Sequence, residues 1–524
     1  MEAKEYDYIV VGSGPAGCVM AEKLSESGAS VLLLEAGENR DEDELIVSPS
    51  ANLYRHFPEY FWWGASVPQD GVGGKDFPLT GGRVLGGGSS VNGEMYVRPT
   101  PYVLEQWARV GGPQWSPGQA TQVFQQLEHY EAPNVDPAVR GERGRLRIRE
   151  SYPETPALVD KLVTAFERAV GFGPVADYND PATPLGPFGG WQVYQFSNGN
   201  RASASACFLS ADVMTPEGGG VDGRRLAVRF QATATKVLFD DAKRAYGVRY
   251  LEDGETREAH AAKKVVVCAG LRSAQLLMLS GIGPAEVLGR AGVPAVCVNE
   301  HVGRHLMDDA YTGAVFSVNG HDVAQLASSD AHAKQHGGAF FPSPDGTGAA
   351  GERSIQVIAT GVTPEVLYLG VLCVNPKSRG TLEIQSDDPL KIMRGDFGFL
   401  SNGADVAVLM EALRTYIAPM AEELAAIDAS YQLLSPASDV LADDGKLEAY
   451  VRSSFIHTYH DQGALRMGTE GDAVVDGWGA VHGVRVLVVA DASIVPYHVD
   501  GNTSAAVYLI GATVAQHLLE EAGA

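Results

Sequence analysis

The feature that most constrains the fold is a glycine turn near the amino terminus, between an apolar strand and a helix. Residues 6–11 (YDYIVV) are an apolar run with β-branched side chains, which predicts a buried strand. Residues 12–17 (GSGPAG) form a G-x-G-x-x-G motif, and residues 18–24 have apolar side chains at helical spacing. A second apolar strand over residues 31–34 ends at Glu35. This order of elements is typical of a Rossmann-type dinucleotide-binding unit.

Each glycine of the turn has a physical role. Gly12 allows the tight turn, Gly14 lets the backbone approach a pyrophosphate, and Gly17 lets the helix pack on the strand. The free N–H groups of the helix N-terminus attract the anion. Glu35 stands where an acidic side chain binds a ribose 2′-OH, which argues against a 2′-phosphate and hence against NADP. The turn alone leaves NAD and FAD both open.

Length and charge restrict the function further. A chain of 524 residues is longer than one typical domain, so we expect two intimately joined domains. The formal net charge is −25, which argues against nucleic acid or an anionic membrane surface as a partner.

The cysteines and the start of the chain bear on its compartment. The first apolar run is already the first strand, with no basic segment before it, so we expect a cytoplasmic protein without a cleaved signal peptide. No run approaches the roughly 18 apolar residues of a membrane span. The five cysteines are scattered without a C-x-x-C motif, and we expect them to be reduced, with no metal site.

Two stretches before residue 100 could contact a ligand. Residues 81–92 (GGRVLGGGSSVN) would present backbone N–H groups and small hydroxyls to a flat or charged ligand. They are far from the first turn in sequence, so we expect them to reach the same cofactor further along. An aromatic group is either a hydrophobic anchor under a loop or a wall of a substrate channel; its members are Tyr54, Phe57, Tyr60, Phe61, Trp62 and Trp63.

The rest of the chain alternates between two kinds of pattern. A strand at 265–268 followed by a helix at 272–280 repeats the arrangement of the nucleotide unit. Strand-like segments between 308 and 453 predict a second domain that carries a sheet, with 318–353 the least structured part. Further expected elements are helices at 123–130, 156–170, 201–214, 405–417 and 503–519 and strands at 226–239, 248–251, 354–360, 366–374 and 484–489.

Several motifs in order along the chain resemble those of the glucose–methanol–choline (GMC) oxidoreductases, a family of FAD enzymes. They are the first glycine turn with Glu35, GRVLGGGSSVN at 82–92, AGLRSAQLLMLSGIGP at 269–284, VGRHLMDD at 302–309, KSRG at 377–380, HDQGALRMG at 460–468 and ADASIVP at 490–496, then Asn502. The fourth motif departs from the family's V-G-x-N-L-x-D-H at His305 and Asp309, and the sixth departs at Ala464 and Leu465 from the usual threonine and cysteine. The resemblance spans residues 6–517.

The resemblance implies an α/β (α+β overall) architecture, in which a Rossmann-type FAD-binding domain joins a substrate domain built on an antiparallel sheet flanked by helices. We place the FAD-binding domain at 1–155, 200–305 and 455–524, and the substrate-binding domain at 156–199 and 306–454. The cofactor-binding residues that the resemblance implies are Gly12, Gly14, Pro15, Ala16, Gly17, Glu35, Ala36, Arg83, Gly87, Ser90, Val91, Asn92, Gly93, Val237, Ala269, Asp491, Ala492 and Thr503. Valine at position 91 cannot form the histidine–FAD bond of some relatives, so the resemblance implies non-covalent FAD.

Oxidation of an alcohol by a flavin needs a base for the hydroxyl proton and a hydride aimed at flavin N5. The family uses a histidine with a second histidine or an asparagine, and here the matching pair is His460 and Asn502. Asparagine is neutral, so it can orient the alcohol and His460 is left as the base. The roles of His457 and His498 stay open.

The function expected is therefore oxidation of a primary alcohol to the aldehyde, with oxygen or another acceptor reoxidising the flavin. The resemblance leans towards a hydroxymethyl group on an aromatic or furan-like ring, and sugars and aliphatic alcohols remain open. Hydroxynitrile lyases share the fold, so a lyase that binds FAD is an alternative of another class. A nicotinamide enzyme or a non-catalytic nucleotide-binding protein fits the second glycine stretch and the His/Asn pair less well.

Overall fold

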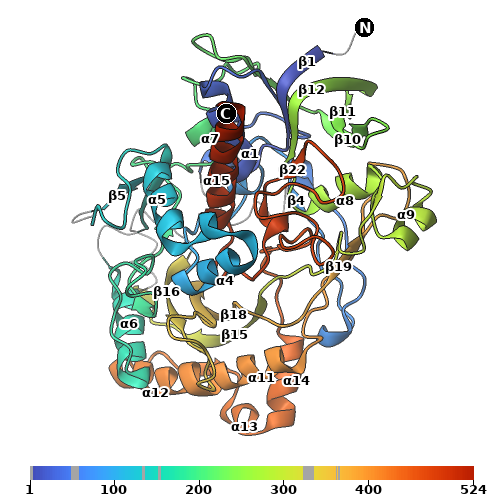
Figure 1. Ribbon diagram of the computed structural model, residues 1–524. Helices are drawn as coiled ribbons and strands as arrows, with labels where there is room; N and C mark the ends of the chain where they lie inside the picture. The colour runs from blue at the N-terminus through green and yellow to red at the C-terminus, as the bar shows by residue number, and fades with distance from the viewer. Residues whose placement is uncertain are drawn as a thin grey trace.

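Two large sheets, each built from widely separated segments, dominate the described structure (Figure 1). The structure is a computed structural model that describes residues 4–48, 58–132, 136–151, 155–322, 335–360, 363 and 366–523. Among these residues no helix has the length and apolar character that crossing a membrane requires. All five cysteines lie in the described part, and each has a free thiol.

The first sheet has seven strands and is parallel at its centre. The strand order is β10-β11-β12-β1-β2-β9, and β22 pairs with β12. The strands are β1 (Lys4–Val11), β2 (Val31–Leu34), β9 (Leu226–Arg229), β10 (Thr233–Phe239), β11 (Ala245–Glu252), β12 (Glu255–Val267) and β22 (Leu487–Val489). β1 runs parallel to both β2 and β12. This confirms the Rossmann-type unit and its strand–turn–helix–strand start.

Helices from the two ends of the chain pack together beside this sheet. α1 (Pro15–Glu26) follows the glycine turn, and α15 (Ser504–Gly523) lies against it (Figure 1). A Cβ at Gly511 would lie only 2.7 Å from Cα of Ala16. The middle of α15 thereby lies directly against the start of α1.

The second sheet has six antiparallel strands in the order β21-β15-β18-β17-β16-β7. They are β7 (Gly186–Phe188), β15 (Ala310–Ser317), β16 (Gln335–Phe341), β17 (Ile355–Thr360), β18 (Val366–Cys373) and β21 (Leu433–Ser435). The helices α6 (Ala157–Val170), α11 (Gly403–Ala412), α12 (Ala418–Ile427), α13 (Ser438–Leu441) and α14 (Asp444–Ser453) lie around it at the bottom of the view (Figure 1). A π-helical segment, η5 (Leu413–Ile417), joins α11 to α12.

Shorter strands and helices lie outside the two large sheets and their helices. The strands among them are β3 (Phe61–Trp62), β4 (Gly81–Gly82), β5 (Glu128–Glu131), β6 (Leu146–Glu150), β8 (Gln192–Val193), β13 (Ile282–Gly283), β14 (Cys297–Val298), β19 (Thr381–Glu383) and β20 (Arg394–Asp396). The helices are α2 (Glu44–Val47), α4 (Pro101–Gly111), α5 (Pro117–Leu127), α7 (Ala204–Phe208), α8 (Leu271–Leu279) and α9 (Ala285–Ala291). Five 3₁₀ turns complete the set: η1 (Pro58–Tyr60), η2 (Asp70–Val72), η3 (Gly87–Ser90), η4 (Pro113–Trp115) and η6 (Ala492–Ile494).

Two expectations about local structure were wrong, and a third needs an addition. Residues 318–353, expected to be the least structured part, include the strand β16, which pairs with β17 and β7. The helix expected at 123–130 ends at Leu127, and the chain continues as β5 because Glu128 pairs with Leu146. The helix expected at 201–214 is limited to α7.

The glycine turn gives a test of the packing. A Cβ at Gly17 would lie 1.9 Å from the carbonyl oxygen of Gly12, whereas a Cβ at Gly14 would meet no atom within 4 Å. We expect Gly17→Ala to lower the free energy of unfolding by on the order of 1–3 kcal/mol, because backbone must move to admit the methyl group. Gly14→Ala is the matched control and should leave it unchanged in denaturant unfolding. Equal stability of the two variants would contradict this account of the turn.

Candidate active site

A cavity of about 490 Å³ lies between the two sheets. The first glycine turn and η3 line one part of it, and Ile358 and Leu372 of the second sheet line another. Residues 457–461 and 502–504 complete the wall. Motifs from both ends of the sequence therefore face one enclosed space, of the size that small-molecule and cofactor sites have.

The two glycine stretches meet directly at this cavity. Gly12 has a φ of 93°, and a Cβ there would lie 2.6 Å from the carbonyl oxygen of Cys268. A Cβ at Gly87 would lie 2.8 Å from Cα of Gly14. The second stretch thus packs on the first turn at Gly87. Gly14 lines the cavity with open space where a Cβ would be, so the backbone there is accessible to a pyrophosphate.

Glu35 is buried at the cavity wall, and both of its carboxylate oxygens are engaged. One oxygen accepts hydrogen bonds from the Ser13 backbone N–H at 3.1 Å and the Ser13 hydroxyl at 2.5 Å, and the other accepts from the Gly37 N–H at 2.7 Å. Burial raises the pKa of the Glu35 carboxyl, and these hydrogen bonds oppose the rise. The carboxylate therefore has a fixed orientation beside the turn.

Most of the sequence-predicted cofactor residues line the cavity. Those that do are Gly12, Gly14, Pro15, Ala16, Glu35, Ala36, Gly87, Asn92, Gly93, Ala269, Asp491, Ala492 and Thr503. Five are not in its lining: Gly17, Arg83, Ser90, Val91 and Val237. Gly17 packs α1 on the turn instead, as its spacing predicts.

The remaining four have other contacts. The Arg83 guanidinium lies over the ring of Trp62, 4.8 Å from its centroid, and Ser90 donates its hydroxyl to the carbonyl of Leu85 at 2.6 Å. Val91 is buried in a small apolar cluster. The Val237 N–H donates to the Ser280 hydroxyl at 2.8 Å, and Thr233 and Ala234 of the same strand line the cavity.

The aromatic group before residue 64 is divided. Trp62 lines the cavity, whereas Tyr60 and Phe61 are buried and the ring of Trp63 is exposed. Tyr54 and Phe57 lie outside the described residues. One member is thus a wall of the cavity, and two belong to an anchor under the loop.

Hydrogen bonds to Asp308 hold the loop that carries His460. The backbone N–H of His460 donates to Asp308 at 2.9 Å, and the hydroxyl of Thr458 donates to the same oxygen. Tyr459 has a φ of 64°, which turns the chain sharply between these two residues.

The imidazole of His460 is bonded at both nitrogens. Its Nδ1 lies 2.6 Å from a carboxylate oxygen of Asp309, and its Nε2 lies 3.1 Å from the amide nitrogen of Asn502. The amide oxygen of Asn502 accepts a hydrogen bond from Gln356 of β17 at 3.0 Å. The structure thus brings together the expected pair, His460 and Asn502, at the cavity wall.

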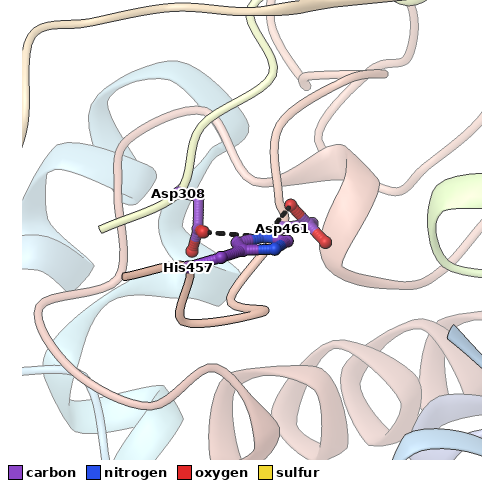
Figure 2. Close-up of side chains that lie close together, drawn as sticks. All are labelled: Asp308, His457 and Asp461. Carbon is purple, nitrogen blue, oxygen red and sulfur yellow. Dashed lines mark ion pairs between the residues drawn. The ribbon is translucent and has the colours of Figure 1, made fainter. Parts of the chain in front are cut away.

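A second imidazole, that of His457, is enclosed by two carboxylates (Figure 2). Its Nε2 lies 3.1 Å from Asp308 and 3.5 Å from Asp461. Burial opposes a charge on this ring, but the two carboxylates more than offset that effect and raise the pKa of His457 to about 9. His457 is therefore an imidazolium at neutral pH and is no candidate for the base. The positive charge of His457 balances the negative charge of Asp308, the carboxylate that holds the His460 loop.

His498, unlike His457, is uncharged. Its Nδ1 lies 2.7 Å from the carbonyl oxygen of Val499, and its Nε2 lies 3.4 Å from Asp309. Burial lowers the pKa of His498, so the ring is neutral at neutral pH. His498 lies behind Asp309 and outside the cavity lining.

Sequence reasoning missed three residues of this network: Asp308, Asp309 and Gln356. The signal for Asp309 was present, because it departs from the family's motif V-G-x-N-L-x-D-H at its last position. Gln356 carried no signal, since a single glutamine in an apolar strand is found beside Asn502 only once the two sheets are placed.

Comparisons with known proteins show the family to which the chain belongs. The GMC oxidoreductase family models match residues 6–310 and 376–511. The chain belongs to the GMC oxidoreductase family. A GMC-type oxidoreductase of Mycobacterium tuberculosis is 32% identical to it, over 96% of this chain and 97% of that protein. An alcohol dehydrogenase [acceptor] of Pseudomonas putida is 28% identical, over 98% and 96%. The crystal structure of pyridoxine 4-oxidase from Mesorbium loti superposes with a TM-score of 0.86 at 25% identity, over 98% and 99%.

As a GMC oxidoreductase, the protein acts on CH–OH groups of small molecules and uses FAD. The cavity fits this cofactor, because its backbone at Gly14 is bare and the turn ends at the N-terminus of α1. Bound there, FAD would supply the acceptor for a hydride.

The ion pair of His457 gives a pH test. Its pKa of about 9 lies above the value of 6.5 for an unperturbed histidine, so the pair stabilises the fold fully below pH 6.5 and loses this effect as the pH rises through 9. We expect the difference in unfolding free energy between the wild type and His457→Gln to shrink by roughly 3 kcal/mol over that interval.

Denaturant unfolding at a series of pH values measures this difference. His482→Gln is the matched control, because the imidazole of His482 bonds to the carbonyl oxygen of Gly468 and not to a carboxylate. Its difference from the wild type should vary far less with pH. A difference for His457→Gln that stays constant from pH 6.5 to 9 would rule out the charged pair.

Proposed function

We propose that this GMC oxidoreductase oxidises a primary alcohol, a hydroxymethyl group on an aromatic or furan-like ring, to the aldehyde. The observation that carries the proposal is the pair of His460 and Asn502 at the cavity wall, with the imidazole Nε2 facing the asparagine amide. His460 accepts the hydroxyl proton of the alcohol at Nε2. Asn502 orients the alcohol oxygen and stabilises the developing charge on it. When bound, FAD would supply the acceptor for the carbinol hydride.

The same proposal assigns the cofactor-binding residues. The Gly12–Gly17 turn would hold the FAD pyrophosphate, and Glu35 would bind the adenosine ribose. The small Val91 supports non-covalent FAD, because valine has no atom that can bond to the flavin. The FAD-binding domain is proposed at 1–155, 200–305 and 455–524, and the substrate-binding domain at 156–199 and 306–454.

The shape of the substrate wall supports a ring-bearing alcohol. The strand register places Gln356 opposite Leu372 and Leu372 opposite Tyr311, so these side chains share one face of the second sheet. Leu372, Tyr311 and Ile358 line the cavity, and the Met95 sulfur lies 3.9 Å from the amide nitrogen of Asn502. An apolar and aromatic wall beside one base favours a flat apolar group over a polyol, which needs many polar partners. The name of the 25%-identical neighbour, pyridoxine 4-oxidase, points the same way.

The role of His460 is tested by anaerobic reduction of the flavin. We expect His460→Ala to lower the rate constant for reduction by an alcohol roughly 10²–10⁴-fold, because it removes the base. FAD absorbance should be retained, since His460 is at the reacting end and not in the glycine turn. His482→Gln is the matched control and should reduce at the wild-type rate. Near-normal reduction of His460→Ala would refute its role as the base.

The substrate class is tested with benzyl alcohol, furfuryl alcohol, hexanol and glucose. We expect anaerobic bleaching of the flavin absorbance at a kcat/KM at least tenfold higher with the first two, owing to the apolar wall. Higher values for glucose or hexanol would overturn the ring-bearing class. Bleaching by none of the alcohols, together with cleavage of mandelonitrile, would favour the lyase. Peroxide release on admission of oxygen would show that oxygen serves as the acceptor.

A further inference from the structure

The carboxylate of Asp309 lies directly behind the proposed base. Asp309 immediately precedes β15 and is fully buried, with an exposure of 0%. One of its oxygens is 2.6 Å from Nδ1 of His460, a short distance that is typical of a charge-assisted hydrogen bond. Asp309 stands where the motif V-G-x-N-L-x-D-H has a histidine.

The Asn502 amide lies on the opposite side of the imidazole. The side-chain nitrogen of Gln356 donates to the oxygen of Asn502, and the nitrogen of Asn502 faces His460. An amide nitrogen can only donate, and Nε2 of His460 therefore accepts. The ring proton is then on Nδ1, where the Asp309 carboxylate accepts it. Hydrogen bonds on both sides of the ring select the same tautomer.

The other carboxylates near Asp309 and His460 pair with a different imidazole. Asp308 and Asp461 share the His457 imidazolium (Figure 2). The second oxygen of Asp309 has no hydrogen-bond donor among the described residues, and it lies 3.4 Å from Nε2 of the neutral His498. The Cys373 thiol of β18, a further titratable neighbour, is also uncharged, because burial raises its pKa. A positive charge on His460 is thus the nearest that can balance Asp309.

We propose that Asp309 is a positioning residue that holds His460 with its proton on Nδ1, so that Nε2 faces the alcohol as the base. This inference rests on the proposed function for its role in catalysis. When Nε2 takes the hydroxyl proton, the ring becomes an imidazolium, and the buried carboxylate stabilises it. The proton stays on His460, and Asp309 remains ionised throughout.

The variant that tests this is Asp309→Asn, which keeps the size of the side chain and removes its charge. The asparagine either accepts from Nδ1–H weakly or donates to Nδ1, which moves the ring proton to Nε2. We expect the plateau rate constant of anaerobic flavin reduction, with the panel alcohol that reduces the wild type fastest, to fall roughly 10²–10⁴-fold. FAD absorbance should be unchanged.

The pH profile separates this role from a merely structural one. Reduction needs neutral His460, so its rate constant rises with pH through the pKa of that ring. Burial opposes the imidazolium, but Asp309, with Asp308 and Asp461, raises its pKa above 6.5. Removal of the Asp309 charge should therefore move the acid limb of the profile to lower pH, by roughly 1–3 pH units. An unmoved limb, or a wild-type rate, would overturn the proposal.

Asp322→Asn is the matched control. Asp322 is also a buried aspartate, but it binds Lys161 and Tyr431 in the substrate domain. Loss of its charge should leave both the rate constant and the acid limb of the profile at their wild-type values. A limb that moved equally in both variants would show a general effect of buried charge and would overturn the specific role of Asp309.

A readout independent of turnover distinguishes this proposal from the proposed function. We expect the proton NMR spectrum of the FAD-loaded wild type to contain a far-downfield Nδ1–H resonance, lost in Asp309→Asn and in His460→Gln and retained in Asp322→Asn. Absence of this resonance from the wild type, or its persistence in Asp309→Asn, would overturn the tautomer. If the resonance behaves as expected while no alcohol reduces the wild type, the proposed function fails, and with it the catalytic role of Asp309, but the assigned tautomer is upheld.

Discussion

Close contact of bare backbone at the first glycine turn determines where the cavity lies. Gly12 sits against the carbonyl of Cys268 at the end of β12, and Gly87 sits against Gly14. Three segments that are distant in sequence therefore meet without side chains between them. Any Cβ at these contacts would separate the segments, whereas the space over Gly14 is open. The turn thus brings three segments of the Rossmann unit into contact. The same few residues leave open space in which an anion can bind.

Charge organises the opposite wall of the cavity. Three buried carboxylates, those of Asp308, Asp309 and Asp461, lie among the imidazoles of His457, His460 and His498. Asp308 and Asp461 pair with His457, which carries a positive charge at neutral pH. Asp308 also holds the loop that carries His460. His460 is left as the ring whose charge can change. Buried charges of this kind are stable only when they are paired, and this pairing is consistent with His460 as the proposed base.

The order of the Rossmann elements and the His/Asn pair could be predicted because each depends on local pattern. Strand, turn and helix follow from apolar spacing and from glycine, and His460 was found through its motif. The contacts of Arg83 and Val237 could not be predicted, because each is set by a partner distant in sequence, Trp62 and Ser280. The strand β16 was missed for the same reason, since its pairing with β17 and β7 supports a strand that its composition does not favour.

The sequence by itself determined the nucleotide-binding unit and the family, and its His-containing motif supplied the proposed base, because each depends on residue types at short, regular spacings. Only the tertiary structure decided the state of that base. The proton position on His460 depends on Asp309, Asn502 and Gln356, which come from three separate segments. A hydrogen bond forms between atoms about 3 Å apart, and no pattern along the chain shows which side chains the folding of two sheets brings to that distance.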